Sequence, residues 1–137
     1  MATARENTGA SATFSDFGVA VGWSSPDTLE TGLDYLFERI PLPKAVTVKK
    51  LRATVETAPT GAAILVDVYL GTITTGVLDG SPIGQISIAI GAFYGELVLS
   101  PFVDWPVTKF AVPALVQVGS VVAGRTLLVT LEGQVAA

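Results

Sequence analysis

An all-β domain, built as an antiparallel sandwich or barrel, is the fold class that the sequence predicts. Val, Ile and Thr dominate from about Phe17 onward, and turn residues recur at short intervals between the apolar runs. No window shows a clear apolar stripe at helical spacing. The nearest candidate, 28–37, contains Gly32, Tyr35 and Phe37, which favour a loop followed by a strand. These observations predict about eight short strands in two sheets or one barrel.

The chain is expected to form one domain preceded by a short arm. Its 137 residues are a common length for a single domain, and no linker or internal repeat divides it. Residues 1–15 are small and polar, and a segment of this composition cannot bury enough apolar area to fold alone. We therefore expect an N-terminal arm over 1–15, either flexible or ordered by a partner, and a β-sandwich domain over 16–137.

Alternation of side chains places the individual strands. The clearest strand patterns lie at 33–40, 46–56, 63–71, 85–90, 94–100, 110–119 and 125–131. In 46–56 the face with Leu51, Ala53 and Val55 is expected to point inward, at least in its second half. The segment 58–61 is expected to form a turn, because Pro59 suits its second position and a glycine follows at Gly61.

Three further strands have one apolar face each. The residues expected to share these faces are Ile64, Val66, Val68 and Leu70; Ile86, Ile88 and Ile90; and Leu127, Val129 and Leu131.

The composition excludes several kinds of chemistry. The chain has neither Cys nor His, so Ser-His-Asp triads, Cys-His dyads and His-based metal sites are impossible. The net charge is −4, and eight basic residues do not make a nucleic-acid-binding surface. The nearest basic cluster, formed by Lys44, Lys49, Lys50 and Arg52, is interpreted as a solvated strand face.

A low content of charged residues needs its own explanation. Hydrophobic residues make up 50% of the chain and charged residues 15%, against about 25% charged in average soluble domains. The longest charge-free runs, 80–95 and 110–124, are too short for a membrane-spanning helix and are broken by Gly and Pro. The N-terminus has no apolar core of the kind that a signal peptide needs. Burial between subunits accounts for the composition better, so we expect a homo-oligomer.

Carboxylates remain as possible catalytic or metal-binding groups, but their spacing gives them no such role. Asp67 lies mid-strand, which is unusual for Asp. No second carboxylate lies at a motif-like spacing. An inter-strand or inter-subunit hydrogen bond to a backbone group or an Arg therefore explains Asp67 better than acid–base catalysis or Ca²⁺ binding. The segment 79–82 reads as a turn and lacks the repeated ligands of a calcium loop. We predict no catalytic, cofactor or metal site, and no enzyme.

Four aromatic residues are candidates for contact with a partner. Trp23, Tyr94, Phe102 and Trp105 lie near predicted strand ends, where they can anchor a subunit interface or fill the core. The alternative is a platform for stacking sugars. A sugar site would want clustered Asp, Asn and Gln, and the only Asn is Asn7.

The chain from Pro41 to its C-terminus resembles a known family. The residues that carry the resemblance are Thr57-Ala-Pro-Thr-Gly-Ala-Ala-Ile-Leu-Val-Asp-Val-Tyr-Leu-Gly71 and Gln117-Val-Gly-Ser-Val-Val-Ala-Gly-Arg-Thr-Leu-Leu-Val-Thr-Leu131. They resemble the jelly-roll domain of bacteriophage virion proteins, which include capsid decoration proteins, head fibres and the distal parts of tail fibres. The resemblance implies an antiparallel jelly-roll β-sandwich that associates as a trimer.

The resemblance also implies a function. We expect a virion structural protein on the outer capsid surface, either a capsid decoration (cement) protein or the base of a head fibre. Its partners would be its own copies and the major capsid protein, with neither nucleic acid nor membrane bound. The alternative is a tail or baseplate adhesin module that binds a bacterial surface glycan.

Overall fold

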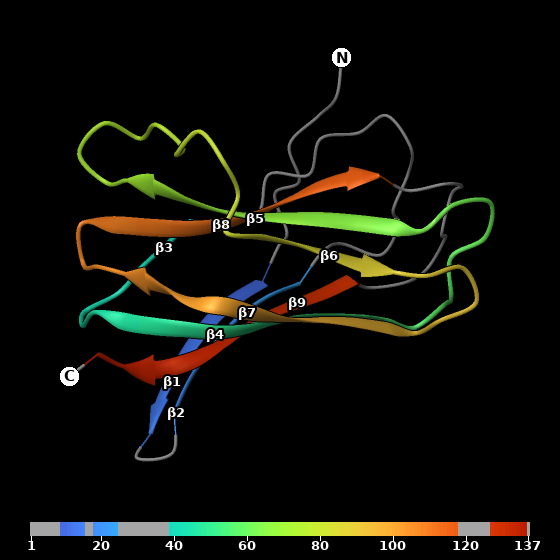
Figure 1. Cartoon of the computed structure of the whole chain (residues 1–137), viewed down its shortest axis with the longest axis horizontal. Helices are drawn as coiled ribbons and strands as arrows, with labels where there is room; N and C mark the ends of the chain where they lie inside the picture. Colours follow the sequence, from blue (N-terminus) through green and yellow to red (C-terminus); the bar gives the residue numbers. More distant parts are fainter. Residues whose placement is uncertain (1–8, 16–17, 25–38, 118–126, 137) are drawn as a thin grey trace.

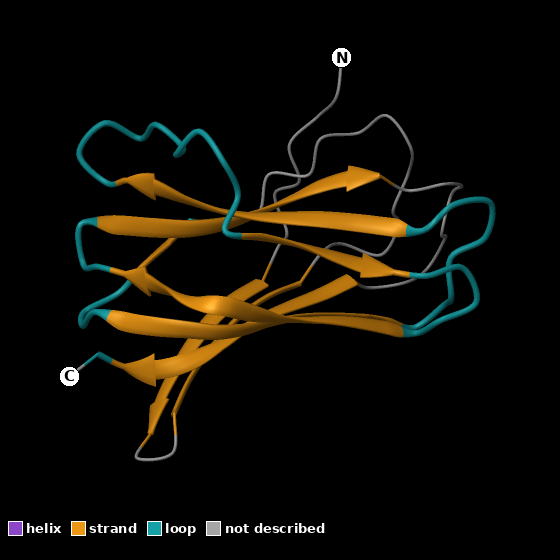
Figure 2. Cartoon of the chain, in the orientation of Figure 1, coloured by secondary structure: helices purple, strands orange, loops and turns teal. Residues whose placement is uncertain are grey.

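Two antiparallel sheets pack face to face in the structure, a computed structural model that describes residues 9–15, 18–24, 39–117 and 127–136 (Figure 1). The strands are β1 (Gly9–Ser15), β2 (Gly18–Ser24), β3 (Ile40–Pro41), β4 (Val46–Val55), β5 (Ile64–Thr72), β6 (Gly84–Ile88), β7 (Tyr94–Trp105), β8 (Lys109–Gln117) and β9 (Leu127–Val135). Figure 2 shows only strands and loops among these residues. The predicted all-β class is confirmed.

The order of the strands defines a jelly roll. One sheet has the order β1-β2-β9-β4-β7 and the other the order β3-β8-β5-β6. From β2 to β9 the chain passes back and forth between the sheets, except at the β5–β6 hairpin, and each sheet receives four of these eight strands. This is the eight-stranded jelly roll that the resemblance implied, with β1 as an additional edge strand.

Part of the expected N-terminal arm is a strand. Residues 9–15 form β1, which pairs antiparallel with β2 from Gly9 opposite Ser24 to Ser15 opposite Gly18. The prediction of an arm over 1–15 is wrong for these residues. Small polar residues do not predict a strand, but the open edge of β2 provides backbone hydrogen bonds that an isolated segment lacks.

The hydrophobic core lies between the two sheets. Its buried residues come mainly from the inward faces of β2, β4, β5, β6, β8 and β9. The largest fully buried side chains are Trp23, Trp105, Leu51, Ile64, Ile86, Ile88, Leu127 and Leu131. The inward faces predicted for 63–71 and 125–131 are confirmed, because all their expected apolar residues are buried.

A bulge in β4 explains why only its second half followed the predicted face. Against β9 the register shifts between Val48, opposite Gly133, and Lys50, opposite Glu132, so Lys49 is an extra residue in β4. Val46 and Val48 point inward before the bulge, and Leu51, Ala53 and Val55 point inward after it. The extra residue shifts the alternation by one, which keeps apolar side chains inward along the whole strand.

Other boundaries differ from the sequence-based expectations. β6 ends at Ile88, so the prediction that Ile90 shares the inward face with Ile86 and Ile88 is wrong; Ile90 is exposed in the turn that follows. β7 continues past the predicted 94–100 to Trp105. The segment 58–61, expected to form a turn, lies in the loop between β4 and β5, where Gly61 has a φ of 83°. Most of the predicted strand 33–40 lies outside the described residues.

Candidate interaction surface

The outer face of the five-stranded sheet carries a row of ion pairs across three strands. Lys50 Nζ of β4 lies 3.5 Å from Glu96 Oε2 of β7 and 4.0 Å from Glu132 Oε1 of β9, and Arg52 pairs with Glu132 as well. Lys49 Nζ donates a hydrogen bond of 2.8 Å to Gln134 Oε1. In this row β4 supplies the cations, and the neighbouring strands supply two carboxylates and the neutral amide of Gln134.

These contacts confirm a solvated strand face for Lys49, Lys50 and Arg52, whereas Lys44 of the predicted cluster lies in the loop between β3 and β4. The paired side chains retain between 30% and 40% of their exposure. Exposed pairs of this kind contribute about 0 to 1 kcal/mol each. The row therefore sets the polarity of the surface and adds little to the stability of the fold.

Apolar side chains lie on the same face beside the ion pairs. Tyr94 and Val98 of β7 are 61% and 63% exposed, and Leu128 of β9 is 43% exposed. Thr54 of β4 lies opposite both Tyr94 and Leu128, so these three residues form a row across the sheet. Further along β7, Phe102 is exposed, and Lys49 Nζ lies 5.3 Å from the centre of its ring.

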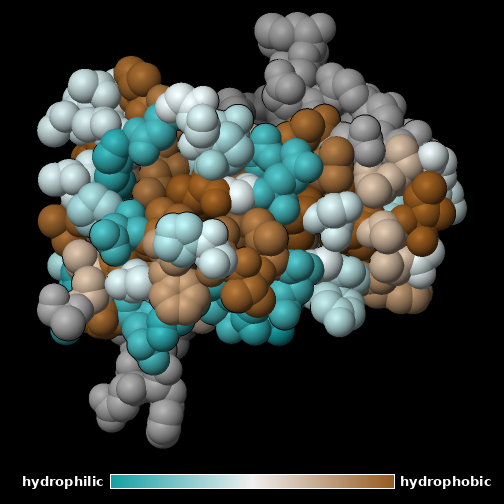
Figure 3. Space-filling view, in the orientation of Figure 1, coloured by the Kyte–Doolittle hydropathy of each residue, from teal (hydrophilic) through white to brown (hydrophobic). Residues whose placement is uncertain are grey.

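The apolar surface continues at one end of the sandwich. Ile90 and Phe93, in the turn between β6 and β7, are exposed and lie next to Tyr94 in the chain. Figure 3 shows apolar surface at the right-hand end of the molecule, where Figure 1 places the loops between β4 and β5 and between β6 and β7. We call Ile90, Phe93, Tyr94, Val98 and Phe102 the β7 patch.

The backbone of β7 adds hydrogen-bonding groups to this patch. β7 is the last strand of its sheet, and none of the described strands pairs with its outer edge. Val55 N donates to Phe93 O at 2.9 Å, and backbone bonding alternates along an antiparallel pair. Gly95 and Leu97 therefore bond to β4, whereas the backbone groups of residues 94, 96 and 98 face the open edge.

The second half of β7 is a poorer edge for pairing. Between the pairs Lys50–Val98 and Val48–Val103, β7 contains more residues than β4, so its regular pairing is interrupted there. Pro101 lies in the interruption and has no N–H to donate. The segment 94–98 is therefore the part of the edge that can accept another strand.

The structure separates the four predicted interface residues into two groups. Trp23 and Trp105 have no exposed area, so their prediction as interface candidates is wrong and both are core residues. Trp105 Nε1 donates a hydrogen bond of 2.8 Å to Lys109 O, which satisfies the indole inside the core. Tyr94 and Phe102 are exposed and lie toward opposite ends of β7.

Sequence reasoning missed three members of the surface. Val98 lies between Leu97 and Leu99, and the run of apolar residues hid its outward direction. Leu128 was expected on the face opposite to that of Leu127 and Val129. Its place in one row with Tyr94, on either side of Thr54, could not be known without the strand pairing. Ile90 was expected on one face with Ile86 and Ile88, and only the end of β6 at Ile88 places it outside.

Two acidic residues outside the row of ion pairs have structural partners. Asp67 Oδ1 accepts a hydrogen bond of 2.8 Å from Gln85 Nε2 on β6. The bond is inter-strand, as expected, but its donor is a side-chain amide and not a backbone group or an Arg. Asp79 Oδ1 lies 2.6 Å from Lys109 Nζ. Within the described part of the chain, no group of three or more acidic residues could hold a metal ion. No helix there could span a membrane.

Comparison with known proteins gives a likeness of fold only. No family model and no curated protein matches the sequence. Among solved structures, the chain is similar to a family 11 carbohydrate-binding module from Clostridium thermocellum in complex with a β-1,3-1,4-mixed-linked tetrasaccharide. The TM-score is 0.40 and the identity 10%, over 96% of this chain and 85% of that chain.

Proposed function

We propose that this chain is a non-catalytic structural subunit of a bacteriophage particle, which acts by oligomeric binding through the β7 patch. The observation that carries the proposal is the exposure of Tyr94, Val98 and Phe102 along one edge strand. Exposed aromatic and branched residues next to free backbone groups favour association with another protein. Half of the chain is hydrophobic, which supports burial of this patch in an assembly.

The proposed place of the subunit is the outer capsid surface. There it serves as a capsid decoration (cement) protein or as the base of a head fibre, bound to its own copies as a trimer and to the major capsid protein. The resemblance of the segments 57–71 and 117–131 to phage virion domains supports this assignment. Buried apolar area and backbone pairing at such a junction need no catalytic group.

Oligomeric state tests the role of the β7 patch. We expect the purified chain at tens of micromolar to have three times the monomer mass by light scattering. Val98→Lys places a charge in the patch and should shift the mass toward the monomer. Val116→Lys changes a residue of similar exposure on the outer face of β8 and should leave the trimer intact. A monomeric wild-type chain would contradict the proposal.

Electron microscopy tests the location. Gold-labelled antibodies against the chain should decorate the shell of the phage particles that contain it. Labelling confined to the tail would rule out the capsid assignment and would leave the adhesin as the remaining virion role.

A second candidate function is a glycan-binding module of a tail or baseplate. The exposed rings of Tyr94 and Phe102 favour it, because exposed aromatic rings can stack on sugars. On a glycan array, an adhesin would bind a bacterial surface glycan and would lose binding in Tyr94→Ala/Phe102→Ala. Intact trimers that bind no glycan would rule this function out.

A further inference from the structure

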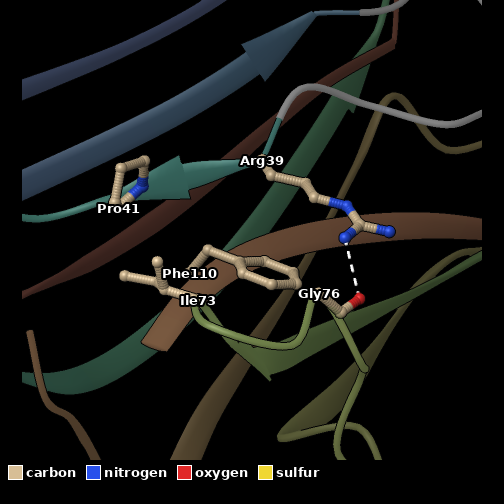
Figure 4. A pocket seen from close by; sticks show the side chains of 5 residues that line it. All are labelled: Arg39, Pro41, Ile73, Gly76 and Phe110. Carbon is tan, nitrogen blue, oxygen red and sulfur yellow. Dashed lines mark hydrogen bonds between the residues drawn. The ribbon is translucent and has the colours of Figure 1, made fainter. Parts of the chain in front are cut away.

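A small apolar pocket with one cation at its mouth lies away from the β7 patch. It has a volume of about 210 Å³ and is lined by Arg39, Pro41, Ile73, Gly76 and Phe110 (Figure 4). These residues come from β3 and the residue before it, from the loop between β5 and β6, and from β8. None of them belongs to the outer face of the five-stranded sheet.

The floor of the pocket is a ring fixed by close packing. Phe110 is 4% exposed and lies opposite Gly71 in the pairing of β5 with β8. A Cβ at Gly71 would lie 2.4 Å from Phe110 Cζ, so the ring occupies the space that any other residue would fill. Phe110 therefore presents a constant apolar surface to whatever enters.

The guanidinium of Arg39 is held over this ring from two directions. Its Cζ lies 4.7 Å from the centre of the Phe110 ring, within cation–π range. Its Nη1 donates a hydrogen bond of 2.9 Å to Gly76 O. Gly76 has a φ of 71°, and Gly76 N donates to Thr72 O at 2.8 Å, so a closed turn aims this carbonyl at the arginine.

Arg39, like Lys44 and Lys49, has no ion pair with any residue that the structure describes. Lys50, Arg52 and Lys109 each pair with a carboxylate. The contacts of the Arg39 side chain are instead a neutral carbonyl and an aromatic ring. No carboxylate of the described residues pairs with its guanidinium, which has further N–H donors beyond the one that Gly76 uses.

We propose that this pocket binds a carboxylate attached to a short apolar group. The carboxylate accepts hydrogen bonds from the free N–H groups of Arg39, whose planar geometry matches a carboxylate. The apolar group lies against Phe110, Ile73 and Pro41. Because the pocket has a volume of only about 210 Å³, we expect its apolar ligand group to be short.

Two sources can supply this chemistry, and the size of the pocket suits both. One is a free short-chain carboxylic acid. The other is the C-terminal residue of a polypeptide, if that residue is small and apolar. The site is independent of the proposed structural role, because neither Arg39 nor Phe110 contributes to the β7 patch.

Titration followed by NMR tests the proposal on the full chain. We expect sodium pentanoate to shift the amide signals of Ile73 and Gly76 in a saturable way. Pentanol lacks the charge and should bind at least about tenfold more weakly, since hydrogen bonds between charged partners are worth a factor of this size. A short peptide ending in Val-Ala with a free carboxylate, compared with its amide, tests the second source.

Variants separate recognition by Arg39 from general effects. Arg39→Gln removes the charge and should weaken pentanoate binding at least about tenfold. Arg39→Lys keeps the charge but lacks the planar guanidinium. Its affinity for pentanoate should therefore lie between that of the wild type and that of Arg39→Gln. Arg52→Gln, on the other sheet, should bind like the wild type. If Arg39→Gln fails to fold, the affinity of Arg39→Lys for pentanoate and the affinity of the wild type for pentanol still test whether Arg39 recognises the carboxylate.

Three results would overturn the proposal. The first is equal affinity for pentanol and pentanoate, which would make the pocket simply apolar. The second is wild-type pentanoate affinity in Arg39→Gln and Arg39→Lys. The third is competition by inorganic phosphate at the concentration at which pentanoate binds, which would show an anion site without an apolar requirement.

Discussion

At the scale of single residues, burial decides which aromatic side chains can contact a partner. The indole of Trp105 is enclosed, and its N–H satisfies the carbonyl of Lys109. Phe102 is close to it in the same strand, yet its ring is exposed. The two residues are three apart in a strand, so simple alternation places them on opposite faces.

The hydrogen bond of Trp105 makes a first prediction. Trp105→Phe removes the donor, leaves the Lys109 carbonyl without its partner and opens a small cavity. We expect it to lower the free energy of unfolding by about 1 to 3 kcal/mol. Tyr69→Phe is the control, because the Tyr69 hydroxyl has no hydrogen-bond partner among the described residues, and it should change stability by less than about 0.5 kcal/mol. Urea unfolding measures both, and equal values would contradict the prediction.

A second prediction concerns the closest approach of β6 to β7. A Cβ at Gly95 would lie 1.9 Å from Ser87 O, a backbone atom that cannot rotate away. Gly95→Ala should therefore force the two strands apart and destabilise the fold by about 1 to 3 kcal/mol or more. Gly80→Ala is the matched control, since a Cβ there meets nothing within 4 Å. If thermal unfolding showed the same midpoint for both variants, the close approach would be incorrect.

At the scale of the elements, the bulge in β4 keeps one strand amphipathic. Without the extra residue, the inward positions before and after it would fall on opposite faces of the sheet. The bulge also places Lys49 where it reaches Gln134 and Phe102 of the two neighbouring strands. One inserted residue thus serves both the core and the outer face.

Deletion of Lys49 tests this account. The deletion would turn either Val46 and Val48, or the three inward residues that follow, toward solvent. Two exposed valines alone cost about 3 kcal/mol or more, so we expect the variant to be largely unfolded by circular dichroism. Lys49→Ala keeps the residue count and should cost less than about 1 kcal/mol. A stable deletion variant would show that β4 can shift its register without loss.

At the scale of the whole molecule, β1 stands apart from the jelly roll. The eight strands from β2 to β9 complete the two four-stranded halves, and β1 pairs only with β2. In Figure 1 the β1–β2 hairpin extends beyond the other strands at the lower edge of the view. The N-terminal strand is therefore an addition to a complete sandwich.

Removal of residues 1–15 tests this independence. We expect the shortened chain to keep a cooperative urea transition with a lower midpoint, because β2 retains its pairing with β9. Removal of 1–8 alone separates the contribution of β1 from that of the residues before it. Loss of the cooperative transition in the shorter variant would show instead that β1 is required for the fold.

The outline of the fold follows from local patterns. Alternation in 63–71 and 125–131 predicted the inward faces of β5 and β9, because the side-chain period of a strand is set by its own backbone. An inter-strand bond for Asp67 was also expected, but its partner, the side chain of Gln85, depends on the pairing of β5 with β6. Strand ends were less predictable, as Ile90 shows, because pairing rather than sequence determines where a strand stops.

The sequence by itself determined the all-β class, the inward faces of the regular strands and the absence of cysteine and histidine chemistry. The tertiary structure alone decided which aromatic residues are buried, where β4 bulges and which strand edge stays open. It also decided that Arg39 meets Gly76, 37 residues further along the chain, above the ring of Phe110. The reason is physical: alternation is local, whereas burial and register depend on strands that the chain brings together from distant positions.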